Sequence, residues 1–459
     1  MAATVELVSL IVLLTNLFTV HVPAIASLTG PVHGCAYLFS IGAVIRDRQR
    51  TTAAVALAVI PGIGGMLALR SLPTPRHGPA PPHRRRSTVT AARPEVIQMP
   101  PPRTDASGPT LSARIQKTVM RLMFRLPETV KRRIAGPAVR LDGQTLALDA
   151  QLMAEMSRRG GVSLVVNGSP GESRAALESG RHALEGPRFK DVISEDLAID
   201  TTGGDLHATL YTPSHLSTPA PLLVFFHGGG WVIGSRTSYD SLVSFLAHHA
   251  QVKIMSVEYR LAPEHPFPAA LDDALAAFEH AHRRADALGV DRARIAVGGD
   301  SAGAHLSAVL AQLAARREGP RPSHQFLFYP ATDFTGRHPS RDLFGEGFLL
   351  TDREIDWFQD QYAQAADRSD PRLSPLLGEV DASIAPAYIA TGGFDPLRDE
   401  GERYAEKLRQ AGTEVVLHRE ADLVHGYLSF FALSTRFRAA ALEAAEAIRS
   451  RLHTASDTK

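Results

Sequence analysis

From about Val192 to the C-terminus, short apolar runs rich in branched residues alternate with stretches of helical periodicity. Strands joined through helices pair in parallel, so this alternation indicates a mostly parallel sheet with helices on both faces. The first two runs, VISEDLAID and LHATLYTP, have no helix between them and predict an antiparallel start. The later strands are expected to begin at Leu222, Val252, Arg294, His324, Ala387 and Val415, and helices are expected over Leu271–Leu288, His305–Arg316 and Glu400–Ala411.

One of these strands, RIAV, runs into a G-x-S-x-G string with Ser301 at its centre. Gly299 and Gly303 leave room for a sharp, strained turn that exposes the serine oxygen. A helical stretch is expected to begin near Ala304, and its N-terminus would favour negative charge beside the serine. The string is common by itself, but a strand before it and a helix after it are typical of a nucleophile elbow.

A second glycine motif, His227-Gly228-Gly229-Gly230-Trp231, follows the strand LLVFF directly. Glycines leave backbone N–H groups uncovered, and such groups can stabilise the oxyanion of acyl transfer. A flexible turn would have the same composition. The motif lies at the end of a core strand, however, and this position favours a role in binding the oxyanion. A phosphate-binding loop is not indicated, because the chain has no G-x-x-x-x-G-K-[ST] string there.

A serine nucleophile needs a base, and the base needs an acid that orients it. His425 follows the strand VVLH, and Asp395 lies after the strand AYIATGG. The order Ser301, Asp395, His425 is the order of the α/β-hydrolase fold. Asp399 and Asp422 are alternative acids, although Asp399 is expected to cap the next helix.

Five motifs in order, HGGGW, YRLAPEHPFPAALDD, GDSAG, DPLRDEGE and HGY, resemble the hormone-sensitive lipase family of α/β-hydrolase esterases. The resemblance implies an oxyanion hole made by Gly229, Gly230 and the N–H of Ala302, with His227 supporting the loop. It also implies a helical cap over about Leu111–Pro187, joined by a helix over Asp352–Tyr362. The chain departs from the family pattern at Ala304 and His305, where the family often has glycine and asparagine, and this departure falls at the expected start of the local helix.

The N-terminal part is expected to lie in a membrane. The stretch from Leu7 to Ile45 contains no Asp, Glu, Lys or Arg, and it is long enough for two membrane spans. A third uncharged stretch, Thr51 to Leu69, would cover roughly 28 Å as a helix. A signal peptide fits poorly, since no basic segment precedes the first apolar run and two more apolar runs follow it. A buried hairpin of a soluble domain is the other alternative. The arginine counts beside the spans favour a cytoplasmic catalytic domain.

The domain boundaries follow from these patterns. We expect a membrane anchor over 1–70, a Pro/Arg-rich linker over 71–110, a helical cap with N-terminal helices over 111–190, and the catalytic domain over 191–459. Within the third segment, Leu111, Ile115, Leu122 and Leu126 recur at helical spacing among basic residues. This helix either lies on anionic lipid or covers the hydrolase body.

Composition excludes several other classes of protein. The formal net charge is +1, which argues against a nucleic-acid partner. The single cysteine, Cys35, cannot form an internal disulfide or a structural zinc site. We therefore expect a serine carboxylesterase or lipase-like hydrolase that cleaves short to medium acyl chains from small-molecule or lipid esters, without a metal or organic cofactor. An amidase or deacetylase using the same triad, or a non-catalytic ligand receptor, are the alternatives.

Overall fold

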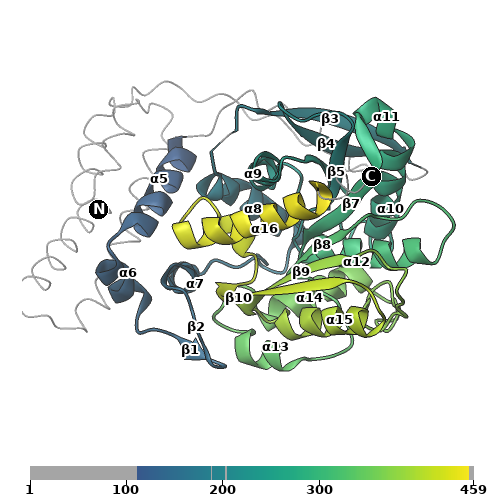
Figure 1. Ribbon diagram of the computed structural model, residues 1–459. Helices are drawn as coiled ribbons and strands as arrows, with labels where there is room; N and C mark the ends of the chain where they lie inside the picture. Colours follow the sequence, from purple (N-terminus) through teal and green to yellow (C-terminus); the bar gives the residue numbers. More distant parts are fainter. Residues whose placement is uncertain (1–110, 188, 202–203, 454–459) are drawn as a thin grey trace, which may run out of the picture. The chain divides into compact units, whose positions relative to one another are not determined.

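The computed structural model describes residues 111–187, 189–201 and 204–453, drawn as the coloured ribbon of Figure 1. An eight-stranded sheet forms its centre, in the order β10-β9-β8-β7-β5-β6-β4-β3. The strands are β3 (Val192–Thr201), β4 (Gly204–Pro213), β5 (Ala220–Phe226), β6 (Lys253–Glu258), β7 (Val290–Asp300), β8 (Gln325–Phe328), β9 (Ala387–Phe394) and β10 (Val415–Val424).

The direction of the strands confirms the predicted topology. Strands β5 to β10 pair in parallel, whereas β4 is antiparallel to both of its neighbours, β3 and β6. Parallel strands point their carboxyl ends toward one edge of the sheet, so the residues that follow β5, β7, β9 and β10 gather there. The register supports this directly, because Phe226 at the end of β5 lies opposite Gly299 near the end of β7.

Helices cover both faces of the sheet, as the alternation predicts. On β5, Leu223 and Phe225 join a core cluster with residues of α9 and α16, while Leu222, Val224 and Phe226 join a second cluster with residues of α10 and α12. Such alternation is the period of two expected of a strand buried on both sides. These helices and their neighbours are α9 (Asp240–Ala250), α10 (Ala269–Arg283), α11 (Ala285–Leu288), α12 (Ala302–Ala315), α13 (Pro339–Phe344), α14 (Asp352–Ala363), α15 (Arg398–Gln410), the 3₁₀ helix η1 (Tyr427–Phe430) and α16 (Thr435–His453).

Two helices begin two residues before their expected starts. Helix α12 begins at Ala302, directly after the serine, and runs unbroken through Ala304 and His305. The departure from the family pattern therefore does not disturb the start of this helix. Helix α15 begins at Arg398, and its N-cap is Leu397 without a side-chain hydrogen bond. The expected capping role of Asp399 is therefore wrong, since Asp399 already lies in the first turn.

The segment predicted as the cap is largely helical. It contains α5 (Leu111–Arg125), α6 (Glu128–Ala135), the hairpin of β1 (Arg140–Leu141) and β2 (Gln144–Thr145), α7 (Leu148–Gly160) and α8 (Pro170–Leu184). Helix α5 lies on the hydrolase body, with Phe124 buried against Phe437 of α16. Leu122, which the predicted apolar stripe includes, instead points outward and is 56% exposed. The periodicity thus found the helix but not the face that packs.

Helix α8 reaches the loop that follows β5. Arg174 donates hydrogen bonds to the carbonyl oxygens of Val232 and Ala262, each at 2.7 Å. Just before α8, Ser163 and the N–H of Leu164 donate to the carboxylate of Glu354 in α14. The segment before α8 is therefore bonded directly to α14.

The three predicted membrane spans lie in residues 1–70, outside the described residues. Within the described ranges, no helix is both long enough and apolar enough to cross a bilayer.

Candidate active site

Ser301 occupies the sharp turn between β7 and α12. Its φ is 53° and its ψ is −117°, a conformation that costs a non-glycine residue on the order of 1–3 kcal/mol. The flanking glycines are required by the end of β5. A Cβ at Gly299 would lie 2.2 Å from the carbonyl oxygen of Phe226, and a Cβ at Gly303 would lie 1.9 Å from the same atom. The elbow therefore packs so closely against the end of β5 that only glycine fits at positions 299 and 303.

The structure brings Ser301, His425 and Asp395 together in one hydrogen-bonded chain. His425 Nε2 lies 3.0 Å from Ser301 Oγ, and His425 Nδ1 lies 2.8 Å from Asp395 Oδ2. A carboxylate only accepts, so Nδ1 carries the proton and Nε2 is left to accept from the serine hydroxyl. Asp395 is fully buried, and its Oδ1 accepts the N–H of Leu397 at 2.8 Å. This arrangement fits a nucleophile, a base and an orienting acid.

The two alternative acids have other partners. Asp399 Oδ2 accepts the N–H of Ser340 at 2.8 Å. Asp422 forms an ion pair with Arg436 at 2.6 Å. The geometry therefore favours Asp395 over both.

The glycine loop after β5 is tied to the elbow through Asp300, a residue that the sequence analysis did not single out. The Asp300 carboxylate accepts the N–H of Gly228 at 2.8 Å and the hydroxyl of Tyr239 at 2.9 Å. Burial raises the pKa of Asp300 to about 6, although both hydrogen bonds oppose that shift. The signal in the sequence was the position itself, since Asp300 fills the variable place between Gly299 and Ser301.

Gly229 and Gly230 are shaped by close neighbours. Gly229 has a φ of 115°, and a Cβ there would lie 2.2 Å from the carbonyl oxygen of Ile233. Gly230 has a φ of 58°, and a Cβ would lie 2.2 Å from Cγ of Phe358 in α14. Among the described residues, no protein acceptor engages the N–H of Gly229 or Gly230. These two donors are therefore available to a ligand, together with the N–H of Ala302 at the start of α12.

His227 supports this loop from behind. Its Nδ1 lies 2.7 Å from the carbonyl oxygen of Gly228, to which it donates. The hydroxyl of Tyr259 donates to the backbone carbonyl of His227 at 2.7 Å, and the two rings stack at 4.3 Å. Complete burial lowers the pKa of His227 to about 4, so the ring is neutral near pH 7. A buried, neutral ring that binds its own loop suits a supporting residue rather than the base.

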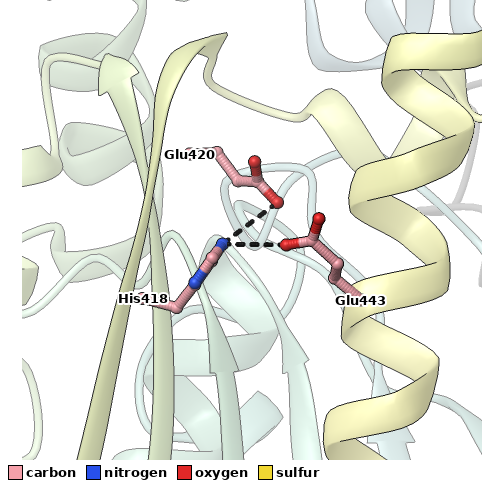
Figure 2. Close-up of side chains that lie close together, drawn as sticks. All are labelled: His418, Glu420 and Glu443. Carbon is pink, nitrogen blue, oxygen red and sulfur yellow. Dashed lines mark ion pairs between the residues drawn. The ribbon is translucent and has the colours of Figure 1, made fainter.

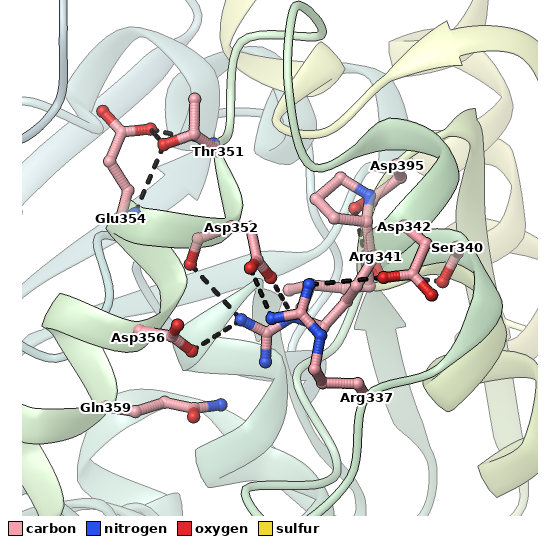
Figure 3. A network of polar contacts seen from close by, with 12 residues as sticks. Arg337, Ser340, Arg341, Asp342, Thr351, Asp352, Glu354, Asp356, Gln359 and Asp395 are labelled. Atoms are coloured by element: carbon pink, nitrogen blue, oxygen red, sulfur yellow. Dashed lines mark hydrogen bonds and ion pairs between the residues drawn. The ribbon is translucent and has the colours of Figure 1, made fainter.

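A network of polar contacts joins the acid-bearing loop to the covering helix α14 (Figure 3). In α13, Ser340 binds both the N–H of Asp399 and the carbonyl oxygen of Pro396. The next residue, Arg341, is buried and bonds Asp352 at 2.5 Å and Asp356 at 2.7 Å in α14. One short helix thereby connects the segment after Asp395 with the helix that packs on Gly230.

A separate group of side chains has donor types that could hold a metal ion (Figure 2). His418 and Glu420 of β10 and Glu443 of α16 place their ligand atoms within 4.8 Å of one another. His418 Nε2 lies 3.3 Å from Glu420 and 3.1 Å from Glu443. Glu420, however, is already paired with the guanidinium of Arg436. That positive charge opposes a cation, so the group is best described as an ion-pair cluster between β10 and α16.

Comparison with known proteins supports the fold and identifies the family. A family profile for the alpha/beta hydrolase fold matches residues 223–429. Carboxylic ester hydrolase LipN of Mycobacterium tuberculosis is 46% identical over 378 residues, which cover 79% of this chain and 99% of that protein. The chain belongs to the hormone-sensitive-lipase-like family of α/β-hydrolases.

Two further proteins are similar to this chain. The ethyl acetate hydrolase of Pseudomonas putida is 42% identical over 263 residues, covering 56% of this chain and 82% of that protein. A hyperthermophilic esterase from Pyrobaculum calidifontis superposes with a TM-score of 0.61 at 33% identity, covering 65% of this chain and 97% of that chain. The predicted α/β-hydrolase fold and the predicted family are therefore confirmed for the hydrolase part of the chain.

Proposed function

We propose that Ser301 is the nucleophile of this ester hydrolase, His425 its general base and Asp395 the acid that orients the base. The observation that carries the proposal is the unbroken chain from Asp395 through His425 to Ser301, with contacts of 2.8 and 3.0 Å. Those distances lie within the range required for proton transfer between the groups.

The reaction follows from this geometry. His425 Nε2 takes the proton of Ser301 while Oγ attacks the ester carbonyl carbon, and the N–H groups of Gly229, Gly230 and Ala302 stabilise the oxyanion. His425 then protonates the departing alcohol as the carbon–oxygen bond breaks, which leaves an acyl-enzyme. In the second half, His425 takes a proton from water, the resulting hydroxide attacks the acyl group, and Ser301 leaves with the proton from His425.

The chain is a serine ester hydrolase, an activity that its family relatives share. We propose that it prefers short to medium acyl chains. The Pseudomonas putida relative is named for a small ester, and the packing of Phe358 on Gly230 brings α14 against the oxyanion loop. Trp231, the residue after Gly230, is only 3% exposed and stacks on Tyr362, so it supports the loop from within the core.

Covalent labelling tests the nucleophile. Treatment with an organophosphate should add one phosphoryl group, and peptide mapping should place it on Ser301. Ser301→Ala should abolish the adduct while leaving the thermal unfolding midpoint close to that of the parent. Labelling at another residue, or persistent labelling of Ser301→Ala, would refute the assignment.

A substrate panel tests the specificity. Butyryl esters should give higher kcat/KM than palmitoyl esters of the same alcohol, and an ester should be cleaved much faster than the matching amide. The reverse order of chain lengths would reject the proposed preference. Faster cleavage of the amide would favour the amidase alternative, and binding without turnover would favour the receptor alternative.

For residues 1–70, we propose membrane attachment, with the catalytic domain on the cytoplasmic side. The support is the length of the uncharged stretches from Leu7 to Ile45 and from Thr51 to Leu69, and the arginines that flank them. The protein should stay with membranes after washing in high salt, and its hydrolase part should resist protease added outside intact spheroplasts. Release by salt would refute the anchor, and digestion from outside would refute the orientation.

A further inference from the structure

Trp231 follows the glycines of the oxyanion loop and has an unusual backbone conformation. Its φ is 62°, in the left-handed region that bulky residues rarely adopt. A side chain in such a conformation persists only when surrounding contacts hold it there. Because Trp231 directly follows Gly229 and Gly230, whatever holds its indole also fixes the direction of their N–H groups.

Aromatic contacts hold the indole ring, but they do not supply an acceptor for its N–H. The ring stacks on Tyr362 of α14, with centroids 4.8 Å apart and planes 6° apart, and it also contacts Phe334 at 5.1 Å. Trp231 is 3% exposed, so solvent contributes little. A buried indole N–H requires an acceptor from the protein.

His305 supplies that acceptor. Trp231 Nε1 donates to His305 Nδ1 at 3.2 Å, and the other ring nitrogen, Nε2, lies 3.0 Å from the carbonyl oxygen of Leu373. The indole can only donate and the carbonyl can only accept, so the tautomer is fixed with its proton on Nε2. Burial lowers the pKa of His305 to about 4, which keeps this neutral tautomer near pH 7.

The position of His305 also links it to the elbow. It lies one helical turn after the nucleophile, and its backbone N–H donates to the carbonyl oxygen of Ser301 at 3.0 Å. The residue therefore contacts the elbow through its backbone and the oxyanion loop through its ring. Asparagine, which the resemblance leads us to expect here, would place an acceptor near Nδ1 but has no atom near Nε2.

We propose that His305 is a positioning residue whose Nδ1 fixes the indole of Trp231 and thereby aims the N–H groups of Gly229 and Gly230 at the oxyanion formed on Ser301. The inference rests on the proposed function, which gives these N–H groups their role. The bond to Leu373 orients the imidazole, whereas the bond to Trp231 acts on catalysis.

Two substitutions separate the hydrogen bonds of His305. His305→Asn retains an acceptor near Nδ1 and loses the bond to Leu373. His305→Gln retains a donor near Nε2 and loses the acceptor for Trp231. Since loss of a whole oxyanion donor lowers kcat about 10²- to 10³-fold, misdirected donors in His305→Gln should lower it about 10- to 100-fold with KM little changed. His305→Asn should stay within about fivefold of the parent, a barrier change near 1 kcal/mol.

Trp231→Phe removes the same hydrogen bond from the other side and should lower kcat to a similar extent. The double variant with His305→Gln should be no slower than the slower single variant, because both remove one interaction. His282→Gln is the matched control, since His282 is a half-buried histidine of α10 that contacts Phe278 edge-on. It should leave kcat unchanged.

The measurements are kcat and KM on a butyryl ester, the thermal midpoint, and the rate at which an organophosphate labels Ser301. Equal losses of kcat in His305→Asn and His305→Gln that follow their thermal midpoints would overturn the inference, as would full activity in Trp231→Phe. If the parent protein is not labelled at Ser301, the proposed function itself fails. If the parent and His305→Gln are labelled equally fast, only the role of His305 fails.

Discussion

The ring of Phe358 fills the space where a side chain at Gly230 would have to be. A Cβ built on Gly230 would lie 2.2 Å from Phe358 Cγ and 2.4 Å from Cδ1. Phe358 belongs to α14, so the covering helix rests directly on a residue proposed to bind the oxyanion. The oxyanion loop therefore cannot gain volume without moving either itself or α14.

Gly230→Ala should consequently impair catalysis more than stability. The methyl group must displace Phe358 or the loop, and either movement misdirects an oxyanion donor. We expect kcat to fall about 100-fold or more. Adding Phe358→Ala would make room and should recover part of the loss.

Gly161→Ala is the control for backbone strain in this experiment. Gly161 ends α7 with a φ of 60°, almost the φ of Gly230, but nothing lies within 4 Å of its Cβ position. Gly161→Ala should lower the free energy of unfolding by about 1 kcal/mol, because alanine is strained in the left-handed conformation, and it should leave kcat unchanged. Equal kinetic losses in the two variants would contradict the proposed role of the contact with Phe358.

The orienting acid gives a second prediction. Asp395→Asn would put an amide opposite His425 Nδ1, which removes the charge and favours the wrong tautomer of the base. We expect kcat to fall about 10⁴-fold while the fold stays intact. The comparison is a set of kcat values with circular dichroism spectra for the parent and the variant.

Asp399→Asn serves as the comparison for that change. Asp399 binds Ser340 and Arg398, and neither is a member of the proposed triad. The kcat of Asp399→Asn should stay within about threefold of that of the parent, which is a change of less than about 1 kcal/mol in the activation barrier. If Asp399→Asn were the slower variant, the acid would have been assigned wrongly.

The contrast between these two aspartates shows how far the sequence could be used for prediction. Strand ends can be recognised in a sequence, and parallel strands bring them to one edge of the sheet, so the sequence alone predicts Ser301, Asp395 and His425 as a group. The close contacts around the glycines follow from the same register, since Phe226 lies opposite Gly299. Local order along the chain was sufficient for this part of the site.

The remaining features depend on contacts that carry no periodic signal. His305 and Trp231 are 74 positions apart, and nothing in either segment marks them as partners. Helix α5 has apolar residues on more than one side, so its periodicity could not show that Phe124 packs while Leu122 is exposed. Such choices are made by the shape of neighbouring elements, which a single sequence does not specify.

Arg341 offers a third prediction, drawn from the network in Figure 3. Its side chain is 4% exposed and bonds both Asp352 and Asp356, so Arg341→Met removes charged hydrogen bonds that water cannot easily replace. We expect the free energy of unfolding to fall by about 2–3 kcal/mol. A lower kcat should accompany it, because α14 loses its connection to the segment after Asp395.

Arg337→Met is the matched control for Arg341→Met. Arg337 also pairs with Asp352, at 2.6 Å, but its side chain is 53% exposed. An exposed ion pair contributes about 0–1 kcal/mol, so stability and kcat should change little. Denaturant unfolding and steady-state kinetics on both variants measure the difference, and equal effects would show that burial of Arg341 is not what matters.

Glu400 provides a prediction about pH. Its side chain is almost completely buried beside Arg341, and one carboxylate oxygen accepts the N–H groups of Thr332 and Asp333 at 2.6 and 3.3 Å. Burial, the largest cause, and the charge of Asp333 raise its pKa from 4.5 to about 8, against the effect of these hydrogen bonds and Arg341. The folded protein therefore keeps a proton at pH 7 that the unfolded chain has lost.

The sign of the effect on stability follows from this difference in proton binding. A raised pKa contributes stability that is fully present below pH 4.5 and is lost as the pH rises through about 8. Glu400→Gln cannot titrate and retains a carbonyl acceptor for the two N–H groups. The parent should therefore lose stability relative to Glu400→Gln between pH 5.5 and 8.5, with a slope of at most about 1.4 kcal/mol per pH unit. Denaturant unfolding of both proteins across this range gives the difference directly, because every other titrating group is common to the two. Parallel curves would mean that Glu400 is ionised in the folded state, and a difference of opposite sign would mean that its charge is stabilised there.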